Sequence, residues 1–380
     1  MSNRMVKNLM RIVVVTVILA FAACSILSCG APEFTFEQKQ EIEQLVDQTM
    51  KDNDIPGVIV GVWVPGEGEF LLAKGKADVE TGQDIKLADR ARIGSNTKSF
   101  VITVLLQLVD EGKVNLNDTL DKFDFGVVIP NGENITVREC CNMTSGLFNY
   151  TVSDGFQEAA GANPYRKWKP QELVEFAVSN NPYFPPGEGF EYSNTNTILI
   201  GMIIEQVTGS DLSEEIQKRI LEPLKLDNTI FPNTPEMTGE YSHGYRYIEG
   251  EDNLVDVTNL LDPSATWAAG AMISNLYDLK VWAKALATGE LISESAQKER
   301  LKLVDGTIED LKVSYGLGIF AIDGFRNHAG ELPGYSTAPF YNPDKEATII
   351  VLLNKNPNNE HLASIKLLQR IAEVVLPEEK

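Results

Sequence analysis

Apolar and polar positions along the chain follow two periods, one typical of helices and one typical of strands. Apolar residues recur at helical spacing in residues 37–51, 95–111 and 360–375. Apolar runs bounded by turn residues predict strands at residues 57–64, 69–76, 315–322, 335–341 and 347–354. The predicted strands therefore lie near both ends of the chain.

The middle of the chain, residues 112–300, alternates helical segments with long loops rich in Pro, Gly and Asn. We therefore expect an α/β protein of the α+β type, in which residues 37–94 and 300–380 form an antiparallel sheet flanked by helices. Residues 95–299 would form an inserted, mainly helical domain. The cleft between two such bodies is the natural place for a functional site.

The first residues have the layout of an export signal. Three cations precede an uncharged apolar run, Ile12 to Ser28, which is short for a transmembrane helix. The run ends in Ile26-Leu27-Ser28-Cys29-Gly30, which resembles a bacterial lipobox with Cys29 as the lipidated residue. Cys24 is a second candidate, and a plain secretory signal is the alternative. We expect residues 1–29 to be a lipoprotein signal peptide.

Residues 30–36 would then be a tether, and a lipid would anchor the mature protein in a bacterial cell envelope, on its periplasmic or extracellular face.

Composition narrows the class of protein. The 380 residues are 43% hydrophobic, enough for a substantial core. The 33 Lys and Arg against 54 Asp and Glu give a net charge of −21, which excludes nucleic acid as the main partner because phosphate binding needs clustered cations. Adjacent Cys140 and Cys141 are expected to be buried thiols. The three histidines, His243, His328 and His361, lack metal-ligand spacing, so we expect no metal and no cofactor.

A serine followed three residues later by a lysine occurs at the start of a predicted helix. Ser95 and Lys98 would share one helix face, one turn apart. A neutral, desolvated amine can take the proton of a serine hydroxyl, and the N–H groups at a helix N-terminus favour a developing oxyanion. The pattern alone is weak, because Ser295 and Lys298 repeat it in a stretch expected to be a solvated helix.

Two further motifs follow, each occurring once. Tyr192-Ser193-Asn194 comes after a Pro-Pro-Gly loop and before a helix expected to start near Thr197. Its phenol can share the Ser95 proton, and its amide can hold a substrate carbonyl. His328-Ala329-Gly330 lies where a new edge strand is expected. A tyrosine or histidine alone is more often a packing residue, so the argument depends on the order of the three motifs.

In this order S-x-x-K, Y-x-N and H-x-G resemble the motifs of penicillin-recognising serine hydrolases, and within them the family that joins D-alanyl-D-alanine carboxypeptidases to class C β-lactamases. The resemblance covers nearly the whole mature chain, including Thr144-Ser145-Gly146-Leu147 and Ala269-Gly270-Ala271-Met272. It implies a β-lactamase/transpeptidase-like fold and acyl-enzyme chemistry. Because the third motif begins with His rather than Lys, the sequence is more similar to secreted DD-peptidases than to β-lactamases.

The resemblance also implies a role for each site residue. Ser95 would attack a D-Ala-D-Ala peptide bond or a β-lactam ring. Lys98 and Tyr192 would share the acid and base roles, in an order that the sequence leaves open. The backbone N–H groups of Ser95 and Glu331 would form the oxyanion hole. Asn194 would orient the acyl side chain of the substrate.

His328, with Ala329 and Gly330, would line the opposite wall of the cleft and help to relay the leaving-group proton or to favour a terminal carboxylate. Ala329 replaces a frequent Thr, and Phe320 sits where some relatives carry an arginine. Glu331 adds its own carboxylate if it points inward, and Arg326 is the cation nearest in sequence. Burying a substrate anion without a partner is expensive, so a free carboxylate is a less secure substrate feature than the acyl-serine.

The leading hypothesis is a carboxypeptidase-like, penicillin-binding serine hydrolase that acts on peptidoglycan peptides. The same chemistry would serve a class C-like β-lactamase, an esterase or a D-amino-acid peptidase. A non-enzymatic penicillin-binding sensor is disfavoured because Ser95, Lys98 and Tyr192 are all present. A Ser-His-Asp hydrolase is disfavoured because no G-x-S-x-G elbow occurs.

Overall fold

The computed structural model describes residues 33–248, 253–308, 311–356 and 362–377. The predicted signal peptide and Cys29 lie outside these ranges. Part of the predicted tether lies inside them and is already folded: Phe34 is buried, and the Thr35 side chain caps the first helix by accepting from the backbone of Gln38. Within the described ranges no helix is long and apolar enough to cross a membrane.

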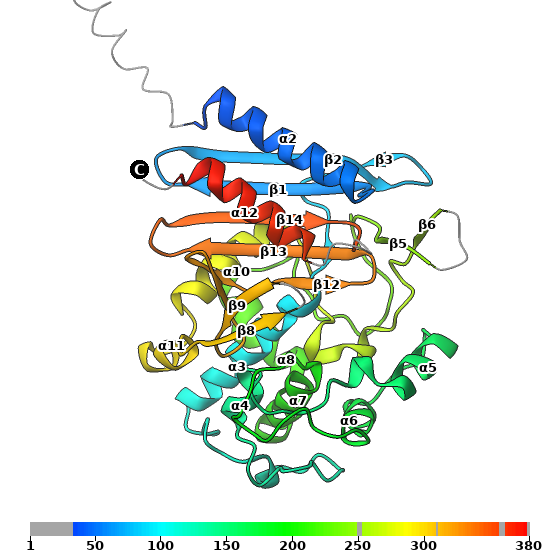
Figure 1. The fold of residues 1–380 in the computed structure, drawn as a ribbon, viewed down its shortest axis with the longest axis vertical. Coiled ribbons are helices and arrows are strands. Elements are labelled where there is room, and N and C mark those ends of the chain that lie inside the picture. The colour runs from blue at the N-terminus through cyan, green and yellow to red at the C-terminus, as the bar shows by residue number, and fades with distance from the viewer. Residues whose placement is uncertain (1–32, 249–252, 309–310, 357–361, 378–380) are drawn as a thin grey trace, which may run out of the picture.

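Strands from both ends of the chain form one antiparallel sheet (Figure 1). Its order is β3-β2-β1-β14-β13-β11-β10-β9-β8, and β12 pairs with β13 as well. The pairing of β1 with β14, with Val60 opposite Val351, joins the two ends as expected. The strands are β1 (Gly57–Val64), β2 (Gly68–Asp78), β3 (Gln83–Asp84), β8 (Val304–Ile308), β9 (Leu311–Tyr315), β10 (Phe320–Ile322), β11 (Phe325–Asn327), β12 (Gly330–Leu332), β13 (Tyr335–Asn342) and β14 (Ala347–Leu353).

Both faces of the sheet are covered, so its central strands are apolar on both sides. Alternate residues of β14 enter different cores: Ile349 and Val351 pack with α2 (Phe36–Asp52) and α12 (Ala363–Val375), while Ile350 and Leu352 pack toward the helical body. Figure 1 shows α2 and α12 together on one face and α10 (Leu276–Thr288) behind the sheet. Although α10 lies in the range 95–299 that we expect to be the helical domain, it packs against β13 and β14.

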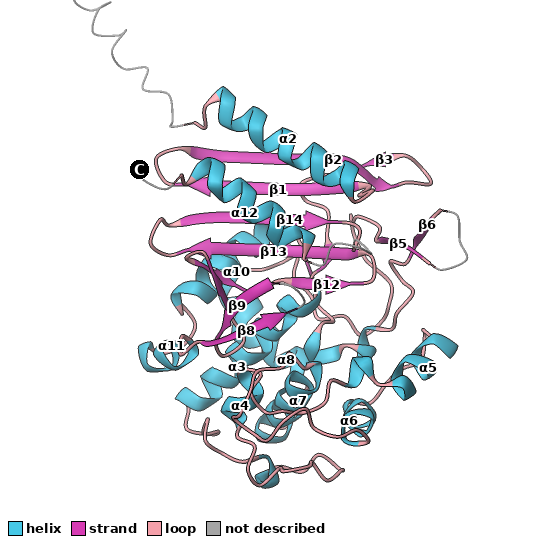
Figure 2. Cartoon of the chain, in the orientation of Figure 1, coloured by secondary structure: helices cyan, strands magenta, loops and turns pink. Residues whose placement is uncertain are grey.

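The rest of the middle of the chain is a helical body beneath the sheet (Figure 2). At its centre lies α3, whose buried residues face all sides, so neighbouring helices surround it. Besides α3 (Thr97–Asp110), the helices are α4 (Val137–Cys141), α5 (Asp154–Ala162), α6 (Pro170–Val178), α7 (Asn194–Thr208), α8 (Leu212–Ile216), α9 (Glu222–Leu224) and α11 (Glu294–Arg300). Short strands pair beside it: β4 (Ala91–Arg92) with β7 (Ile273–Ser274), and β5 (Tyr245–Tyr247) with β6 (Leu254–Asp256).

The predicted fold class is confirmed, with two local differences. The strand expected over 315–322 is interrupted, because Gly316 and Gly318 bring the chain against Arg300 and Ile102 more closely than any side chain would permit. The helix expected near Thr197 begins at Asn194. The second difference places Asn194 on the first turn of a helix, where its position is fixed.

Candidate active site

Ser95 lies on a single 3₁₀ turn, Gly94–Asn96, that leads directly into α3. Two glycines let β12 approach this turn. Gly94 has φ +52°, and a Cβ there would lie about 3 Å from the backbone of Glu331. A Cβ on Gly330 would lie 1.9 Å from the carbonyl oxygen of Ile93. The third motif therefore packs backbone against backbone on the turn that carries Ser95.

Lys98 is fully buried one turn further along α3. Its Nζ lies 3.0 Å from Ser95 Oγ and donates to Asn194 Oδ1 and to the carbonyl oxygen of Ala269, each at 2.7 Å. It forms no ion pair with any residue in the described ranges. Burial without an anionic partner lowers the pKa of Lys98 well below its ordinary value.

These hydrogen bonds determine where the lone pair of a neutral Lys98 amine points. A neutral amine has two N–H donors and one lone pair. The oxygens of Asn194 and Ala269 can only accept, so they use both hydrogens. The lone pair is left for Ser95 Oγ, as a general base for this hydroxyl requires.

Tyr192 packs beside the same group, with its ring centroid 5.0 Å from Lys98 Nζ. Its hydroxyl is buried and forms no hydrogen bond of normal geometry with any described residue. Burial raises the pKa of the phenol, and the nearby Ser95 hydroxyl lowers it by less. The phenol is therefore protonated at neutral pH, and among the described residues its hydroxyl has no acceptor at normal hydrogen-bond geometry.

His328 is placed differently from the expectation. Its side chain is completely buried where the chain turns from β11 into β12, stacked on Phe320 with ring centroids 4.3 Å apart. Nε2 lies 3.0 Å from the Tyr315 hydroxyl, and Nδ1 contacts the carbonyl oxygen of Ala329. Burial lowers the pKa of His328 to about 3, and Lys98 adds to this shift when it is protonated. The expectation that it lines the cleft is wrong: it packs behind Tyr192, with ring centroids 6.2 Å apart.

Of the residues after His328, some are buried in the packing of the protein and others lie at the cleft. Ala329 and Gly330 are buried. In the hairpin, Leu332 pairs with Tyr335 across a two-residue turn. Hydrogen-bonded pairs alternate from this closing pair, so the N–H of Glu331 is directed away from β13, toward the Ser95 turn. The Glu331 carboxylate accepts from the backbone N–H of Leu362 at 2.8 Å, so it is held toward the start of α12 and away from Ser95.

A cleft of about 540 Å³ opens above Ser95 and Asn194. Asn194, which sequence reasoning placed toward the substrate, also holds Lys98. Its own amide is oriented by two residues that the sequence analysis missed: Nδ2 donates to Asn149 Oδ1 at 3.3 Å and to Thr151 Oγ1 at 3.2 Å. The carbonyl of Ala269 was also missed, although it lies in a stretch that the resemblance includes. In the described ranges no group of three or more His, Cys, Asp or Glu side chains could hold a metal ion.

A half-buried serine at a cleft, next to a fully buried lysine and a protonated phenol, is the arrangement of hydrolases that form an acyl-enzyme on serine. Comparison with known proteins agrees. The family described as Beta-lactamase matches residues 42–373. The chain therefore belongs to the β-lactamase family, and it is a serine hydrolase of the class that includes penicillin-binding protein homologues.

Curated relatives are identical to this chain at about a quarter of the aligned positions. Protein flp of Staphylococcus aureus (strain MW2) is 27% identical over 337 residues, which are 85% of this chain and 64% of that protein. Penicillin-binding protein 4* of Bacillus subtilis (strain 168) is 26% identical over 323 residues, which are 80% of this chain and 70% of that protein. The chain thus spans less than two thirds of Protein flp.

Solved structures with the same fold include a D-stereospecific amidohydrolase and a D-amino acid amidase. A D-stereospecific amidohydrolase from Streptomyces sp. is 32% identical, with a TM-score of 0.77 over 90% of this chain and 98% of that one. A D-amino acid amidase from Ochrobactrum anthropi SV3 is 25% identical, with a TM-score of 0.80 over 89% of this chain and 98% of that one.

Proposed function

We propose that this protein hydrolyses the amide bond that follows a D-amino acid residue through an acyl-enzyme on Ser95, and that its natural substrates are D-alanyl-D-alanine peptides of peptidoglycan. One observation carries the acyl-enzyme: the buried Nζ of Lys98, whose pKa burial lowers, lies 3.0 Å from Ser95 Oγ, and its other two hydrogen bonds go to oxygens that only accept. The structural relatives that act on D-amino acid amides support the stereochemistry of the substrate.

In the proposed reaction Ser95 Oγ bonds to the substrate carbonyl carbon while its proton moves to Lys98 Nζ. The resulting oxyanion lies between the backbone N–H groups of Ser95 and Glu331. Tyr192 then protonates the leaving nitrogen, the C–N bond breaks, and Lys98 returns its extra proton to the phenol oxygen. Water repeats the sequence on the ester, so the acid product leaves and Ser95 regains its proton.

The electrostatics favour Lys98 as the base for acylation. Burial moves the pKa values of the two candidates in opposite directions, down for Lys98 and up for Tyr192. Each shift stabilises the uncharged form, so a free amine is available at neutral pH whereas a phenolate is not. The proposal therefore assigns the first proton transfer to Lys98 and the second to Tyr192.

A second candidate substrate is a simple D-amino acid amide, favoured by the 32% identity to the D-stereospecific amidohydrolase. A D-alanyl-D-alanine peptide and a D-amino acid amide differ in the leaving group, which carries a carboxylate only in the peptide.

As part of the same proposal, we place the protein in the cell envelope of a bacterium, anchored through Cys29. Mass measurement of the mature N-terminus tests this: a lipidated Cys29 supports it, and an unmodified N-terminus contradicts it.

Mass spectrometry after incubation with penicillin, with a D-Ala-D-Ala tripeptide and with D-phenylalanine amide tests the function, together with an assay of released amine. With penicillin we expect an adduct on Ser95 that turns over slowly. With the D-Ala-D-Ala tripeptide we expect release of D-alanine. Rapid penicillin turnover would indicate a β-lactamase, and hydrolysis of acyl esters without any adduct would indicate an esterase. Ser295→Ala is the matched control for Ser95→Ala. Full activity in Ser95→Ala would overturn the proposal.

A further inference from the structure

A side cavity of about 200 Å³ opens from the active-site cleft. The two spaces share their boundary residues and are therefore continuous; these are Arg246, Leu261, Thr266, Gly270, Leu332 and Pro333. At the roughly 30 Å³ that one water occupies, the side cavity has room for about six non-hydrogen atoms. A side group of a substrate bound at Ser95 can therefore reach into it.

Most of the wall of this side cavity is apolar, and two arginines are its only charged lining residues in the part of the chain that the structure describes. Arg246 stands on β5, at the boundary between the cleft and the side cavity. Its side chain forms no hydrogen bond or ion pair with any described residue. Because the chain carries a net charge of −21, an arginine without a carboxylate partner at the edge of a cleft is unusual.

Arg92 stands on β4 and is only 7% exposed. Its Nε and Nη2 donate to the carbonyl oxygens of Thr258 and Pro235, which are neutral acceptors. Burial lowers its pKa, and the charge of Asp262 opposes this only in part. The Asp262 Oδ1 already accepts from the backbone and hydroxyl of Ser264. The side cavity therefore has a positive charge behind its apolar lining that Asp262 compensates only in part.

We propose that the side cavity binds a carboxylate of the substrate, carried on a short apolar arm, with Arg246 as its direct partner and Arg92 as the charge behind it. A guanidinium that has all its donors available can hold a carboxylate through two parallel hydrogen bonds. This inference rests on the proposed function, since it names the chemistry of the substrate taken by the same site.

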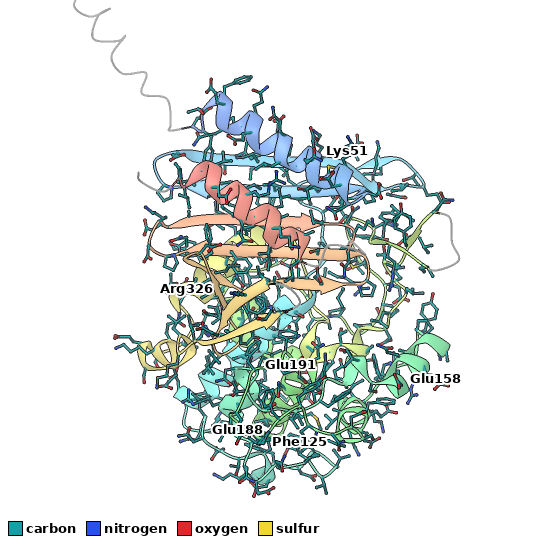
Figure 3. All side chains as sticks on the ribbon, in the orientation of Figure 1. Lys51, Phe125, Glu158, Glu188, Glu191 and Arg326 are labelled. Carbon is teal, nitrogen blue, oxygen red and sulfur yellow. The ribbon has the colours of Figure 1, made fainter. Side chains whose placement is uncertain are left out.

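The proposal also supplies the cation that the third motif lacks. Phe320 is buried against His328 and cannot contact a substrate. Arg326, the nearest cation in sequence, lies on β11 at the left edge of the molecule, whereas β5 lies at the right edge (Figures 1 and 3). Carboxylate recognition is therefore assigned to Arg246 on β5.

The carboxylate can belong to the leaving group or to the acyl side of the substrate, and two matched pairs distinguish these sources. N-acetyl-D-alanyl-D-alanine against its C-terminal amide tests the leaving group. N-succinyl against N-butanoyl D-alanine p-nitroanilide tests the acyl side. We expect Arg246→Gln to discriminate within one of these two pairs. In that pair it should lower kcat/KM about 10- to 100-fold for the compound with the carboxylate and less than about 3-fold for its neutral counterpart. Arg326→Gln removes the same charge elsewhere and should change neither.

Calorimetric binding of the same four compounds to the Ser95→Ala protein tests the side cavity without turnover. A preference for a charged member that disappears in Ser95→Ala/Arg246→Gln supports the inference. Equal affinity for both members of both pairs, or a preference that survives Arg246→Gln, overturns it. Ser95-dependent hydrolysis of the neutral compounds without any charge preference would leave the proposed function standing and remove the side cavity from it.

Discussion

The chain contains the same four-residue pattern twice, in two regions with opposite surroundings. Ser95 and Lys98 lie at the start of the central helix, where Lys98 is fully buried without an anionic partner. Ser295 and Lys298 lie on α11 at the surface, where the Lys298 side chain is 72% exposed and forms an ion pair with Glu294 at 2.6 Å. Sequence spacing places the members of each pair on one helix face, but only in the first pair is the lysine buried, and this burial lowers the pKa of Lys98.

Substituting Lys98 and Lys298 in parallel should give the largest difference in acylation rate between the two pairs. Lys98→Met should lower the rate of penicillin acylation by at least about 10³-fold, because the base is lost. The same change should raise the free energy of unfolding by roughly 1 kcal/mol at pH 7. The folded-state pKa is lowered, so below about 10.5 the unfolded lysine binds a proton that the folded one does not. Denaturant unfolding at pH 7 and pH 10 should show the gain shrinking as pH rises.

Removing the hydroxyl of Tyr192 while keeping its ring tests whether acylation of Ser95 requires a proton donor in addition to Lys98. Tyr192→Phe should lower acylation about 10²- to 10³-fold, since the leaving nitrogen loses its proton donor. Stability should not fall, because the buried hydroxyl has no hydrogen-bond partner among the described residues. Rapid-mixing mass spectrometry measures the rate, and near-normal acylation would mean that the phenol has no part in it.

The backbone contact that positions the first pair can be broken directly. Gly330→Ala places a Cβ 1.9 Å from the carbonyl oxygen of Ile93, so β12 must move away from the Ser95 turn. We expect a loss of about 2–4 kcal/mol in unfolding free energy and a parallel loss of acylation. Gly66→Ala is the comparison: φ is +84° but nothing lies within 4 Å, so about 1 kcal/mol from the backbone alone is expected. Equal losses in the two variants would contradict the contact.

The buried histidine behind the first pair should be detectable in acid. The pKa of His328 is about 3 in the folded protein against 6.5 ordinarily, so between these values the unfolded state binds the extra proton. Stability should therefore fall as pH drops from about 6.5 toward 3, by several kcal/mol from this group. His328→Gln should flatten this part of the curve relative to the unsubstituted protein. Identical acid curves would show that the histidine is protonated while folded.

The smallest effect is expected at the second pair. Lys298→Ala and Ser295→Ala should leave acylation unchanged and alter unfolding free energy by less than about 0.5 kcal/mol, because the ion pair is exposed. These variants also serve as controls for Lys98→Met and Ser95→Ala. A tenfold loss of acylation in either one would mean that the pattern acts outside the cleft.

Sequence patterns predicted the parts of the fold that repeat with a regular period. The pairing of β1 with β14 and the helix after Ser95 follow from apolar spacing, because packing on a sheet or around a helix imposes that spacing. The interruption between β9 and β10 could not be seen this way, since Gly316 and Gly318 are required by contacts with residues distant in sequence.

The candidate site, like the fold, was predicted from the sequence only in part. Motif order was enough to bring Ser95, Lys98 and Asn194 together, but it could not show which motif residues face the cleft. His328 shares its motif with Gly330 and was expected at the surface of the cleft, yet the corner between β11 and β12 buries it. Arg246 carries no motif signal, and only its lack of a partner beside a cavity distinguishes it from other cations.

The position of α2 and α12 has a practical consequence for handling the protein. The two helices pack together on the outer face of the sheet, and Figure 1 shows both ends of the described chain at that side of the molecule, away from β12. A purification tag, a fluorophore or an immobilising support joined at either end would leave the route to Ser95 open.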